Sequence, residues 1–261
     1  MKKLYVVGNN TSKSLSPLIF NYWFSKYKLK AKYEYIEVDH KNLHKEVSAV
    51  LNDKKTIGLN ITIPYKKKIM KYVGSFDKHS TKIKAVNFVI NKGSRKGFNT
   101  DWIGYYNSIR RLTNLKKRKI LLLGYGGASQ SIHYTLKQAK PKELTIYNRT
   151  KRKILFEKKT KFTKTTNLEK YLPNADLIIN TTPTNPIKKH MVKLVKPNAI
   201  ISEIVYNPKI TKFLRQFPNH KKNYGIDMLL EQAIPCFEKL FDFKPVVDQK
   251  LIKLLNDKVK K

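Results

Sequence analysis

The stretch that decides the fold is Ile120-Leu121-Leu122-Leu123-Gly124-Tyr125-Gly126-Gly127-Ala128-Ser129. Its four leading residues are apolar, which is typical of a buried strand. Three glycines then permit a tight turn, and helical spacing follows over Gly127–Gln138. A strand, a glycine-rich turn and a helix in this order present backbone N–H groups and a helix dipole to an anion such as a pyrophosphate. The stretch therefore predicts a nucleotide-binding α/β fold.

The small residues of this turn have separate tasks. Gly124 permits the tight turn, and Gly126 lets the backbone approach the phosphates of a nucleotide. Gly127 and Ala128 begin the helix. The third glycine that is usual in such turns is replaced by Ser129, so close packing of the helix here has to rely on small residues.

The segments after this helix repeat the alternation. Apolar runs predict strands at Leu144–Tyr147, Leu177–Asn180 and Ala199–Ile204. Strands that alternate with helices along the chain predict a parallel sheet.

The residues that follow Leu144–Tyr147 indicate which nucleotide the turn receives. An acidic residue at this place would bind the ribose hydroxyls of NAD, but the sequence has Asn148, Arg149 and Thr150. Arginine pairs bidentately with a 2′-phosphate, Thr150 offers a further donor, and Lys153 adds positive charge one helical turn later. The pattern predicts a preference for NADP over NAD of at least about tenfold.

The N-terminal part of the chain predicts a second α/β region. Strands are expected at Leu4–Val7, Tyr33–Val38 and Ile57–Ile63, with helical spacing between them, which makes a βαβαβ start. Ser16 is expected as the N-cap of the first helix. Pro17 would then occupy the first helical position, where a missing N–H costs no hydrogen bond.

Further elements are expected to complete both regions. A strand at Val86–Ile90 leads through a turn at 91–94 into a helix that begins at Asn99-Thr100-Asp101. We expect this helix to link the two regions. Two closing helices are predicted near the end of the chain, at Met228–Leu240 and Val246–Lys258.

The composition bounds the class of protein. The chain has 261 residues, 41% of them hydrophobic, which suffices for two domains with cores of their own. A net charge of +37 is typical of proteins that bind polyanions, so a non-catalytic nucleic-acid- or anion-binding protein is one alternative. The basic residues are, however, spread along the whole chain without a basic tail or a zinc-finger spacing. This favours weak, salt-sensitive attraction to RNA over a specific nucleic-acid partner.

Other classes are disfavoured by the sequence. No apolar run is long enough to span a bilayer, and the start Met1-Lys2-Lys3-Leu4 lacks the apolar region of a signal peptide, so we expect a cytoplasmic protein without a membrane partner. The single cysteine, Cys236, excludes an intramolecular disulfide. The six histidines do not cluster at ligand spacing, so no metal is expected.

Three further motifs stand in the N-terminal part: Ser14-Leu15-Ser16-Pro17, Asn60-Ile61-Thr62-Ile63-Pro64-Tyr65-Lys66 and Asn99-Thr100-Asp101. In their order and spacing, and with the glycine-rich turn after them, they make the chain resemble the shikimate dehydrogenase family over nearly its whole length.

The resemblance implies an α/β protein of two domains. One is an α/β substrate domain with a mixed sheet, formed by residues 1–100 plus 225–261. The other is a Rossmann-like, doubly wound NADP domain, formed by residues 101–224.

The resemblance also implies an activity, because the family reduces 3-dehydroshikimate to shikimate with NADPH on the chorismate route to aromatic amino acids. It assigns Ser14 and Ser16 to the substrate carboxylate, and hydroxyl donors at a helix N-terminus suit an anion. Hydride transfer to a ketone builds negative charge on oxygen, so a proton donor is needed. Lys66 is the expected donor, with Asp101 orienting it.

Further site residues follow from the same resemblance. The remaining substrate-binding positions are Thr62, Asn87, Tyr206 and Gln232. The remaining cofactor-binding positions are Ile204, Gly225 and Met228.

The chain departs from the family pattern at three places. Phe88 replaces a threonine, Glu203 replaces an aspartate, and Thr184-Asn185 replaces the small residues that usually continue the loop after Asn180. A quinate or broad-specificity enzyme is a second alternative, because such enzymes share much of this signature, although two serines in the first motif favour shikimate. We expect a monomer or a homodimer.

Overall fold

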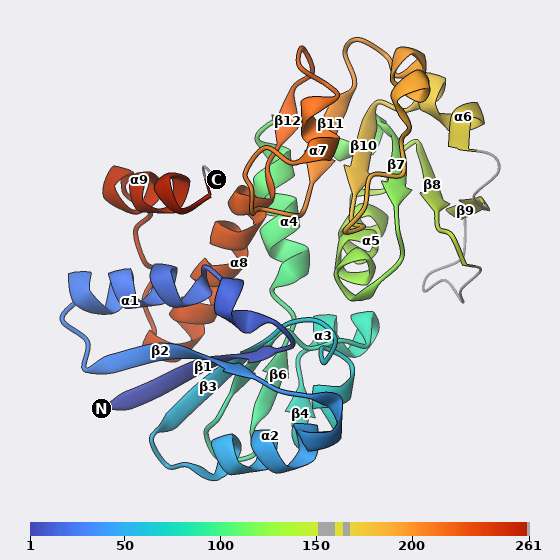
Figure 1. Ribbon diagram of the computed structural model, residues 1–261. Coiled ribbons are helices and arrows are strands. Elements are labelled where there is room, and N and C mark those ends of the chain that lie inside the picture. Colours follow the sequence, from blue (N-terminus) through green and yellow to red (C-terminus); the bar gives the residue numbers. More distant parts are fainter. Residues whose placement is uncertain (151–159, 164–167, 260–261) are drawn as a thin grey trace. The chain divides into compact units, whose positions relative to one another are not determined.

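The computed structural model describes residues 1–150, 160–163 and 168–259 (Figure 1). The chain divides into two compact units. The first contains Met1–Thr100 and Gln232–Asp257, and the second contains Asp101–Glu231 and the chain end from Lys258. The division of the chain falls directly before Asp101 and again inside the helix α8 (Gly225–Phe241).

The first unit contains a six-stranded mixed sheet in the order β2-β1-β3-β5-β6-β4. Its strands are β1 (Lys2–Gly8), β2 (Ala31–Glu37), β3 (Thr56–Ile61), β4 (Ser75–Phe76), β5 (Phe88–Ile90) and β6 (Lys96–Phe98). Strand β1 pairs in parallel with β2 and β3, and β5 runs antiparallel to β3 and β6. The prediction of a βαβαβ start followed by a mixed sheet is confirmed.

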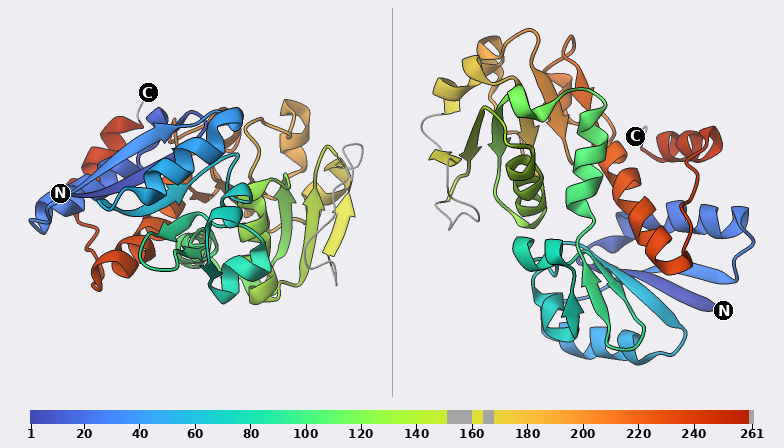
Figure 2. Two further views of the ribbon diagram at one scale, coloured as in Figure 1. Left: turned by 90° about the horizontal axis from the view of Figure 1, so that it is seen from below. Right: turned by 180° about the vertical axis from the view of Figure 1, so that it is seen from behind.

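Helices cover both faces of this sheet. They are α1 (Ser16–Lys26), α2 (Leu43–Asn52), α3 (Lys78–Ile83), the C-terminal part of α8, and α9 (Gln249–Lys258). Helices α1 and α2 lie on opposite faces (Figures 1 and 2). On the α1 face, aromatic rings join α1 to α8, since Trp23 and Phe237 lie 5.3 Å apart and Phe24 and Phe241 lie 5.6 Å apart. Such contacts stabilise the return of the chain end to this unit.

The start of α1 differs from the prediction. Ser16 is the first helical residue rather than the N-cap, Pro17 follows inside the first turn, and Leu15 occupies the cap position without a side-chain bond. The Ser14 hydroxyl takes the capping role instead, because it accepts a hydrogen bond from the Ser16 N–H at 3.2 Å. The expected cap was therefore wrong by one residue, while both serine hydroxyl groups remain at the helix N-terminus.

The second unit contains a six-stranded parallel sheet in the order β12-β11-β10-β7-β8-β9. The strands are β7 (Lys119–Leu123), β8 (Glu143–Tyr147), β9 (Thr160–Thr163), β10 (Leu177–Asn180), β11 (Ile200–Glu203) and β12 (Lys222–Asn223). The helices are α4 (Asp101–Arg110), α5 (Gly127–Ala139), α6 (Leu168–Tyr171), α7 (Lys212–Arg215) and the first part of α8. The chain order reverses at β7, which is the doubly wound arrangement expected from the sequence.

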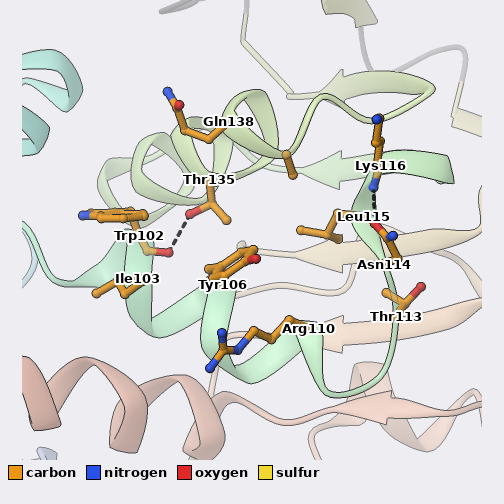
Figure 3. Close-up of a pocket in the computed structure, with 11 residues that line it drawn as sticks. Trp102, Ile103, Tyr106, Arg110, Thr113, Asn114, Leu115, Lys116, Thr135 and Gln138 are labelled. Atoms are coloured by element: carbon orange, nitrogen blue, oxygen red, sulfur yellow. Dashed lines mark hydrogen bonds between the residues drawn. The ribbon is translucent and has the colours of Figure 1, made fainter.

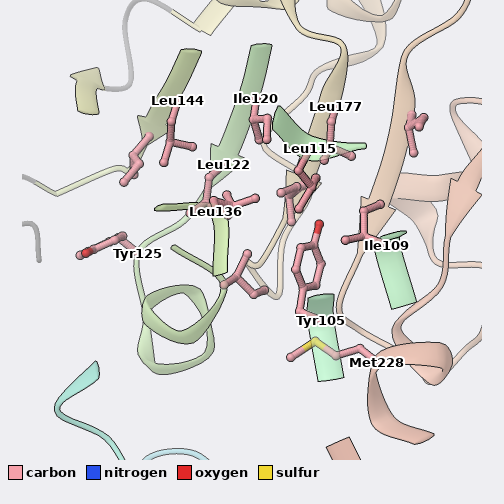
Figure 4. Packing of buried hydrophobic residues seen from close by; sticks show 14 residues of the cluster. Tyr105, Ile109, Leu115, Ile120, Leu122, Tyr125, Leu136, Leu144, Leu177 and Met228 are labelled. Carbon is pink, nitrogen blue, oxygen red and sulfur yellow. The ribbon is translucent and has the colours of Figure 1, made fainter. Parts of the chain in front are cut away.

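The continuous apolar run of β7 has a plain structural reason. Ile120 and Leu122 pack into one core with Tyr105 of α4 and Leu136 of α5 (Figure 4). Leu121 and Leu123 point to the other face and join a second core. Successive strand residues alternate between faces, so a strand covered on both sides has to be apolar throughout. No helix within the described ranges is long and apolar enough to cross a bilayer.

Candidate active site

The segments of the first unit that carry predicted substrate-binding residues meet at one edge of its sheet. Strands β1 and β3 are parallel neighbours, so the segments after them, which carry Ser14 and Thr62, leave the sheet on the same side. A Cβ atom added to Gly8 at the end of β1 would clash with the Thr62 side chain, which shows how closely the two segments approach. Strand β5 is antiparallel to β3, and this brings Asn87 to the same edge, with its carbonyl accepting from the Ile61 N–H at 2.8 Å.

The segment that carries Lys66 is held by its backbone and by the buried ring before it. The Tyr65 hydroxyl donates to the Val38 carbonyl at 2.6 Å, and burial raises the pKa of this phenol. The Lys66 carbonyl accepts from the Val86 N–H at 2.8 Å, directly beside Asn87. The Lys66 side chain is half-buried. The position of this lysine along the sheet edge is therefore fixed by its neighbours.

Asn87 and Gln232 belong to one hydrogen-bonded network. The Asn87 amide donates to Thr100 Oγ1 at 2.9 Å and to Gln232 Oε1 at 3.3 Å, and Asn87 Oδ1 accepts from the Thr100 N–H at 2.7 Å. All three side chains are buried. Burying an amide costs free energy unless the amide is hydrogen-bonded. The network therefore fixes the orientation of Asn87 and Gln232, two predicted substrate-binding side chains from distant parts of the chain.

Sequence reasoning assigned no role to the residues behind this network. The hydroxyl of Thr100, a member of this network, lies 3.2 Å from Cys236 Sγ. Asn60 donates to the Asn87 carbonyl at 3.3 Å and accepts from the Tyr33 hydroxyl at 2.8 Å. The available signals were the motifs that contain Asn60 and Thr100, and the helical spacing on α8 that places Cys236 one turn after Gln232. These residues support the predicted substrate-binding side chains of the network on the side of the protein core.

Two predicted substrate residues belong to the second unit. Asp101 follows Thr100 directly and is the buried first residue of α4. Tyr206 lies after the end of β11 and is half-buried. The other predicted substrate residues, Ser14, Ser16, Thr62, Lys66, Asn87 and Gln232, all belong to the first unit.

In the second unit, the glycine-rich turn between β7 and α5 has the geometry that the sequence predicted. Gly124 has a φ of +93°, a conformation that side chains disfavour, and a Cβ atom there would lie 2.7 Å from Thr181 Oγ1. Cβ atoms added to Gly126 and Gly127 would meet nothing within 4 Å, so open space lies above both residues. Ser129, in the place of the usual third glycine, accepts from the Gly126 N–H at 3.1 Å and contacts Thr181 Oγ1 at 2.5 Å.

The residues after β8 lie beside this turn. Asn148 Oδ1 accepts from the Tyr125 N–H at 3.2 Å, and its amide donates to the Thr150 carbonyl at 2.6 Å. Arg149 and Thr150 are exposed at the carboxyl end of β8. The predicted ligand Lys153 lies outside the described residues.

A buried polar pair under the turn was not anticipated from the sequence. The Tyr125 hydroxyl and His133 Nδ1 lie 2.9 Å apart, and both side chains are buried. Burial lowers the pKa of His133 to about 4, with a smaller contribution from Lys137. The histidine is therefore neutral at physiological pH, and it supports Tyr125 of the glycine-rich turn.

The remaining predicted cofactor residues frame the end of β11. A Cβ atom on Gly225 would clash with the Ile204 carbonyl, so only glycine lets α8 begin this close to the strand end. Met228 is buried one turn later in the core that contains Tyr105. The turn and these residues occur at the same edge of the parallel sheet, because β7 and β11 both end there.

A separate pocket of about 620 Å³ lies between α4 and α5 (Figure 3). Its walls include Trp102, Tyr106 and Arg110, and the Thr135 hydroxyl donates to the Trp102 carbonyl at 2.6 Å. None of the predicted site residues lines it. Among the described residues, no cluster of His, Cys, Asp and Glu could hold a metal ion.

The fold and the site define a dinucleotide-dependent oxidoreductase with a separate substrate-binding unit. The family described as "Shikimate dehydrogenase substrate binding domain" matches residues 6–89, and the one described as "Shikimate / quinate 5-dehydrogenase" matches residues 108–227. The chain belongs to the shikimate dehydrogenase family.

Individual relatives agree with this assignment. The chain is 36% identical to "Shikimate dehydrogenase (NADP(+))" of Bacillus cytotoxicus, over 95% of this chain and 96% of that protein. It is 31% identical to the protein of the same name from Saccharolobus solfataricus, over 96% and 93% of the two chains. The crystal structure of shikimate dehydrogenase from Aquifex aeolicus superposes with a TM-score of 0.86 at 28% identity, covering 98% of this chain and 97% of that one.

Proposed function

We propose that this chain catalyses the reversible, NADPH-dependent reduction of 3-dehydroshikimate to shikimate. The observation that carries the proposal is the set of substrate motifs gathered at one sheet edge of the first unit, with Asn87 and Gln232 already hydrogen-bonded to each other. The names of both relatives specify NADP(+), and this agrees with Arg149 at the end of β8.

The polar edge suits a substrate that carries a carboxylate and several hydroxyl groups. Ser14 and Ser16 lie at the N-terminus of α1, where hydroxyl donors and the helix dipole favour an anion. Thr62, Asn87 and Gln232 provide donors and acceptors for ring hydroxyls. A site built in this way rejects analogues that lack a hydroxyl, because its own buried groups would then lose their partners.

Proton transfer is assigned to Lys66 and Asp101. As the carbonyl carbon is reduced, negative charge develops on the carbonyl oxygen, and the Lys66 ammonium is proposed to donate a proton to that oxygen. Asp101 is proposed to orient the ammonium and to bind a neighbouring hydroxyl. In the oxidative direction the same lysine accepts the proton from the alcohol.

The turn of the second unit fits NADPH, which supplies the hydride when bound. Open space above Gly126 and Gly127 admits the pyrophosphate to the N–H groups at the start of α5. Arg149 and Thr150 are proposed to hold the 2′-phosphate, and Lys153 is proposed to add charge to the same site.

A quinate or broad-specificity dehydrogenase is the second candidate, because the description of the family that matches residues 108–227 includes quinate. Both serines of the first motif favour shikimate. A cytoplasmic location, a monomeric or homodimeric state and the absence of a specific nucleic-acid partner remain predictions from the sequence.

The test is the formation of NADPH, followed by its absorbance, when the purified chain is given shikimate and NADP. Parallel reactions contain quinate in place of shikimate, or NAD in place of NADP, and Asp101→Asn is the control variant. We expect turnover with shikimate and NADP, a rate at least about tenfold lower with NAD, and loss of turnover in the variant. A folded chain that reduces NADP with neither alcohol would contradict the proposal.

A further inference from the structure

Glu203, one of the departures from the family pattern, is a buried carboxyl group at the end of β11. Its side chain is 2% exposed. The carboxylate accepts hydrogen bonds from the Val205 N–H at 3.1 Å, from Asn180 Nδ2 at 3.1 Å and from Thr211 Oγ1 at 3.2 Å. Burial raises the pKa of Glu203, and these donors oppose the rise. Since each of these neighbours donates, the surroundings fit a hydrogen-bond acceptor at the end of a side chain as long as that of glutamate.

The orientation of Asn180 follows from the backbone next to it. Asn180 Oδ1 accepts from the Thr182 N–H at 3.1 Å, and a backbone N–H can only donate. The amide nitrogen must therefore face Glu203 Oε2 and the Thr184 carbonyl, at 3.1 and 3.2 Å. Asn180 thus joins the Glu203 carboxylate to the backbone carbonyl of Thr184 in one hydrogen-bonded network.

The same network borders the glycine-rich turn. Strand β10, which ends at Asn180, lies between β7 and β11, so the loop 180–184 and residues 204–206 leave the sheet beside the turn. Thr181 Oγ1 donates to the Leu123 carbonyl at 2.7 Å, which joins that loop to the end of β7. Arg149 lies on the opposite side of β7, at the end of β8. A dinucleotide held at Arg149 by its adenosine end therefore extends over β10 and β11 with its nicotinamide end.

We propose that Glu203 is a positioning residue that holds the loop 180–184 and residues 204–206 in the conformation that receives the nicotinamide half of the cofactor. This inference rests on the proposed function. Glu203 acts through Asn180 on the loop and through the Val205 N–H on the segment that begins at Ile204, a predicted cofactor residue. Thr211, the N-cap of α7, anchors the carboxylate on its third side, since the same hydroxyl accepts from the Leu214 N–H.

The test is Glu203→Gln, with NADPH binding measured by titration of the cofactor's fluorescence. Glutamine keeps the shape but turns one acceptor into an NH₂ donor that faces other donors. We expect the Kd for NADPH to rise about tenfold, while the KM for 3-dehydroshikimate stays within about twofold. Glu169→Gln, an exposed acid on α6, is the matched control and should leave both values unchanged.

Asn180→Ala and the double variant decide whether Glu203 acts through Asn180. If it does, the double variant binds NADPH no more than about twofold more weakly than Glu203→Gln alone. Asn180→Ala also supplies the measurement if Glu203→Gln does not fold. The inference would be overturned if the folded variants bound NADPH like the unmodified chain. It would also be overturned if the loss of NADPH affinity in the double variant equalled the product of the losses in the two single variants. Because binding is read without turnover, an unmodified chain that binds NADPH but does not oxidise shikimate would count against the proposed function alone.

Discussion

The two candidate binding regions are built in opposite ways. In the first unit, we call the sheet edge that carries Ser14, Thr62 and Asn87 the substrate edge. It is formed by side chains that are hydrogen-bonded to one another, as Asn87 is to Thr100 and Gln232. In the second unit, the glycine-rich turn is defined by the absence of side chains, since Gly126 and Gly127 have open space where a Cβ atom would be. A ring with several hydroxyl groups requires many specific partners, whereas a pyrophosphate requires access to backbone N–H groups.

This contrast predicts how each region fails. Removing a side chain from the substrate edge leaves buried partners unpaired, so the loss is large and specific for the substrate. Adding even a methyl group above the turn excludes the phosphates without disturbing the fold, because nothing in the protein occupies that space.

The largest expected effect is that of Lys66→Ala. Loss of the proposed proton donor should lower turnover by about a hundredfold or more, the usual contribution of a general acid, while NADPH binding is unchanged. Steady-state kinetics in both directions measure it. Lys67→Ala, an exposed neighbour, is the matched control. Turnover of Lys66→Ala within about threefold of the unmodified chain would show that another group donates the proton.

A smaller effect concerns the pH dependence of the free energy of unfolding, and it is expected for the second unit, which contains His133. The pKa of His133 is lowered to about 4 by burial, below its value of about 6.5 in an unfolded chain. Between these pH values the unfolded second unit binds a proton that the folded unit does not. Its free energy of unfolding should therefore fall with falling pH, by up to about 1.4 kcal/mol per pH unit.

The two tryptophans allow each unit to be followed alone. In Trp23→Phe only Trp102, in the second unit, remains, and in Trp102→Phe only Trp23, in the first, remains. Urea unfolding of Trp23→Phe over a pH series should show the slope, and adding His133→Gln should flatten it. An unchanged slope in the His133→Gln background would mean that other groups cause it.

The next effect concerns the choice between cofactors. Arg149→Ala should weaken NADPH binding about tenfold and leave NADH binding within about twofold, because only NADPH carries the 2′-phosphate. Fluorescence titration with both cofactors measures the ratio. Arg215→Ala, on α7 of the same unit, serves as control. Equal weakening for both cofactors would mean that Arg149 does not read the 2′-phosphate.

Much of the fold could be predicted from the sequence, because its strongest signals are local. The alternation of apolar runs and helices gave the parallel strands β7, β8, β10 and β11. Shorter elements such as β4, β6 and α3 were not predicted, because two to six residues carry too little periodicity and form only through pairing with neighbours. The N-cap of α1 was expected at Ser16 but falls at Leu15, because Ser14 and Ser16 are equally good capping residues and it is the Ser14 hydroxyl that bonds the helix.

The site was predictable only as a set of positions. Motifs identified Asn87 and Gln232 separately, but their hydrogen bond joins residues far apart in the chain, and no local pattern encodes it. The same holds for Glu203 and Thr184, which the sequence marks as two unrelated departures and the structure joins through Asn180. Long-range pairing of buried polar groups depends on the tertiary fold, so it is visible only in the folded structure.

The most direct test of this contrast measures both ligands on two variants, one from each region. Calorimetry gives the Kd for shikimate and fluorescence gives the Kd for NADPH, for Gln232→Ala and for Gly126→Ala. We predict that Gln232→Ala weakens shikimate binding about tenfold or more and leaves NADPH binding within about twofold, and that Gly126→Ala does the reverse without lowering the Tm. Equal weakening of both ligands by either variant would show that the two regions do not recognise their ligands independently.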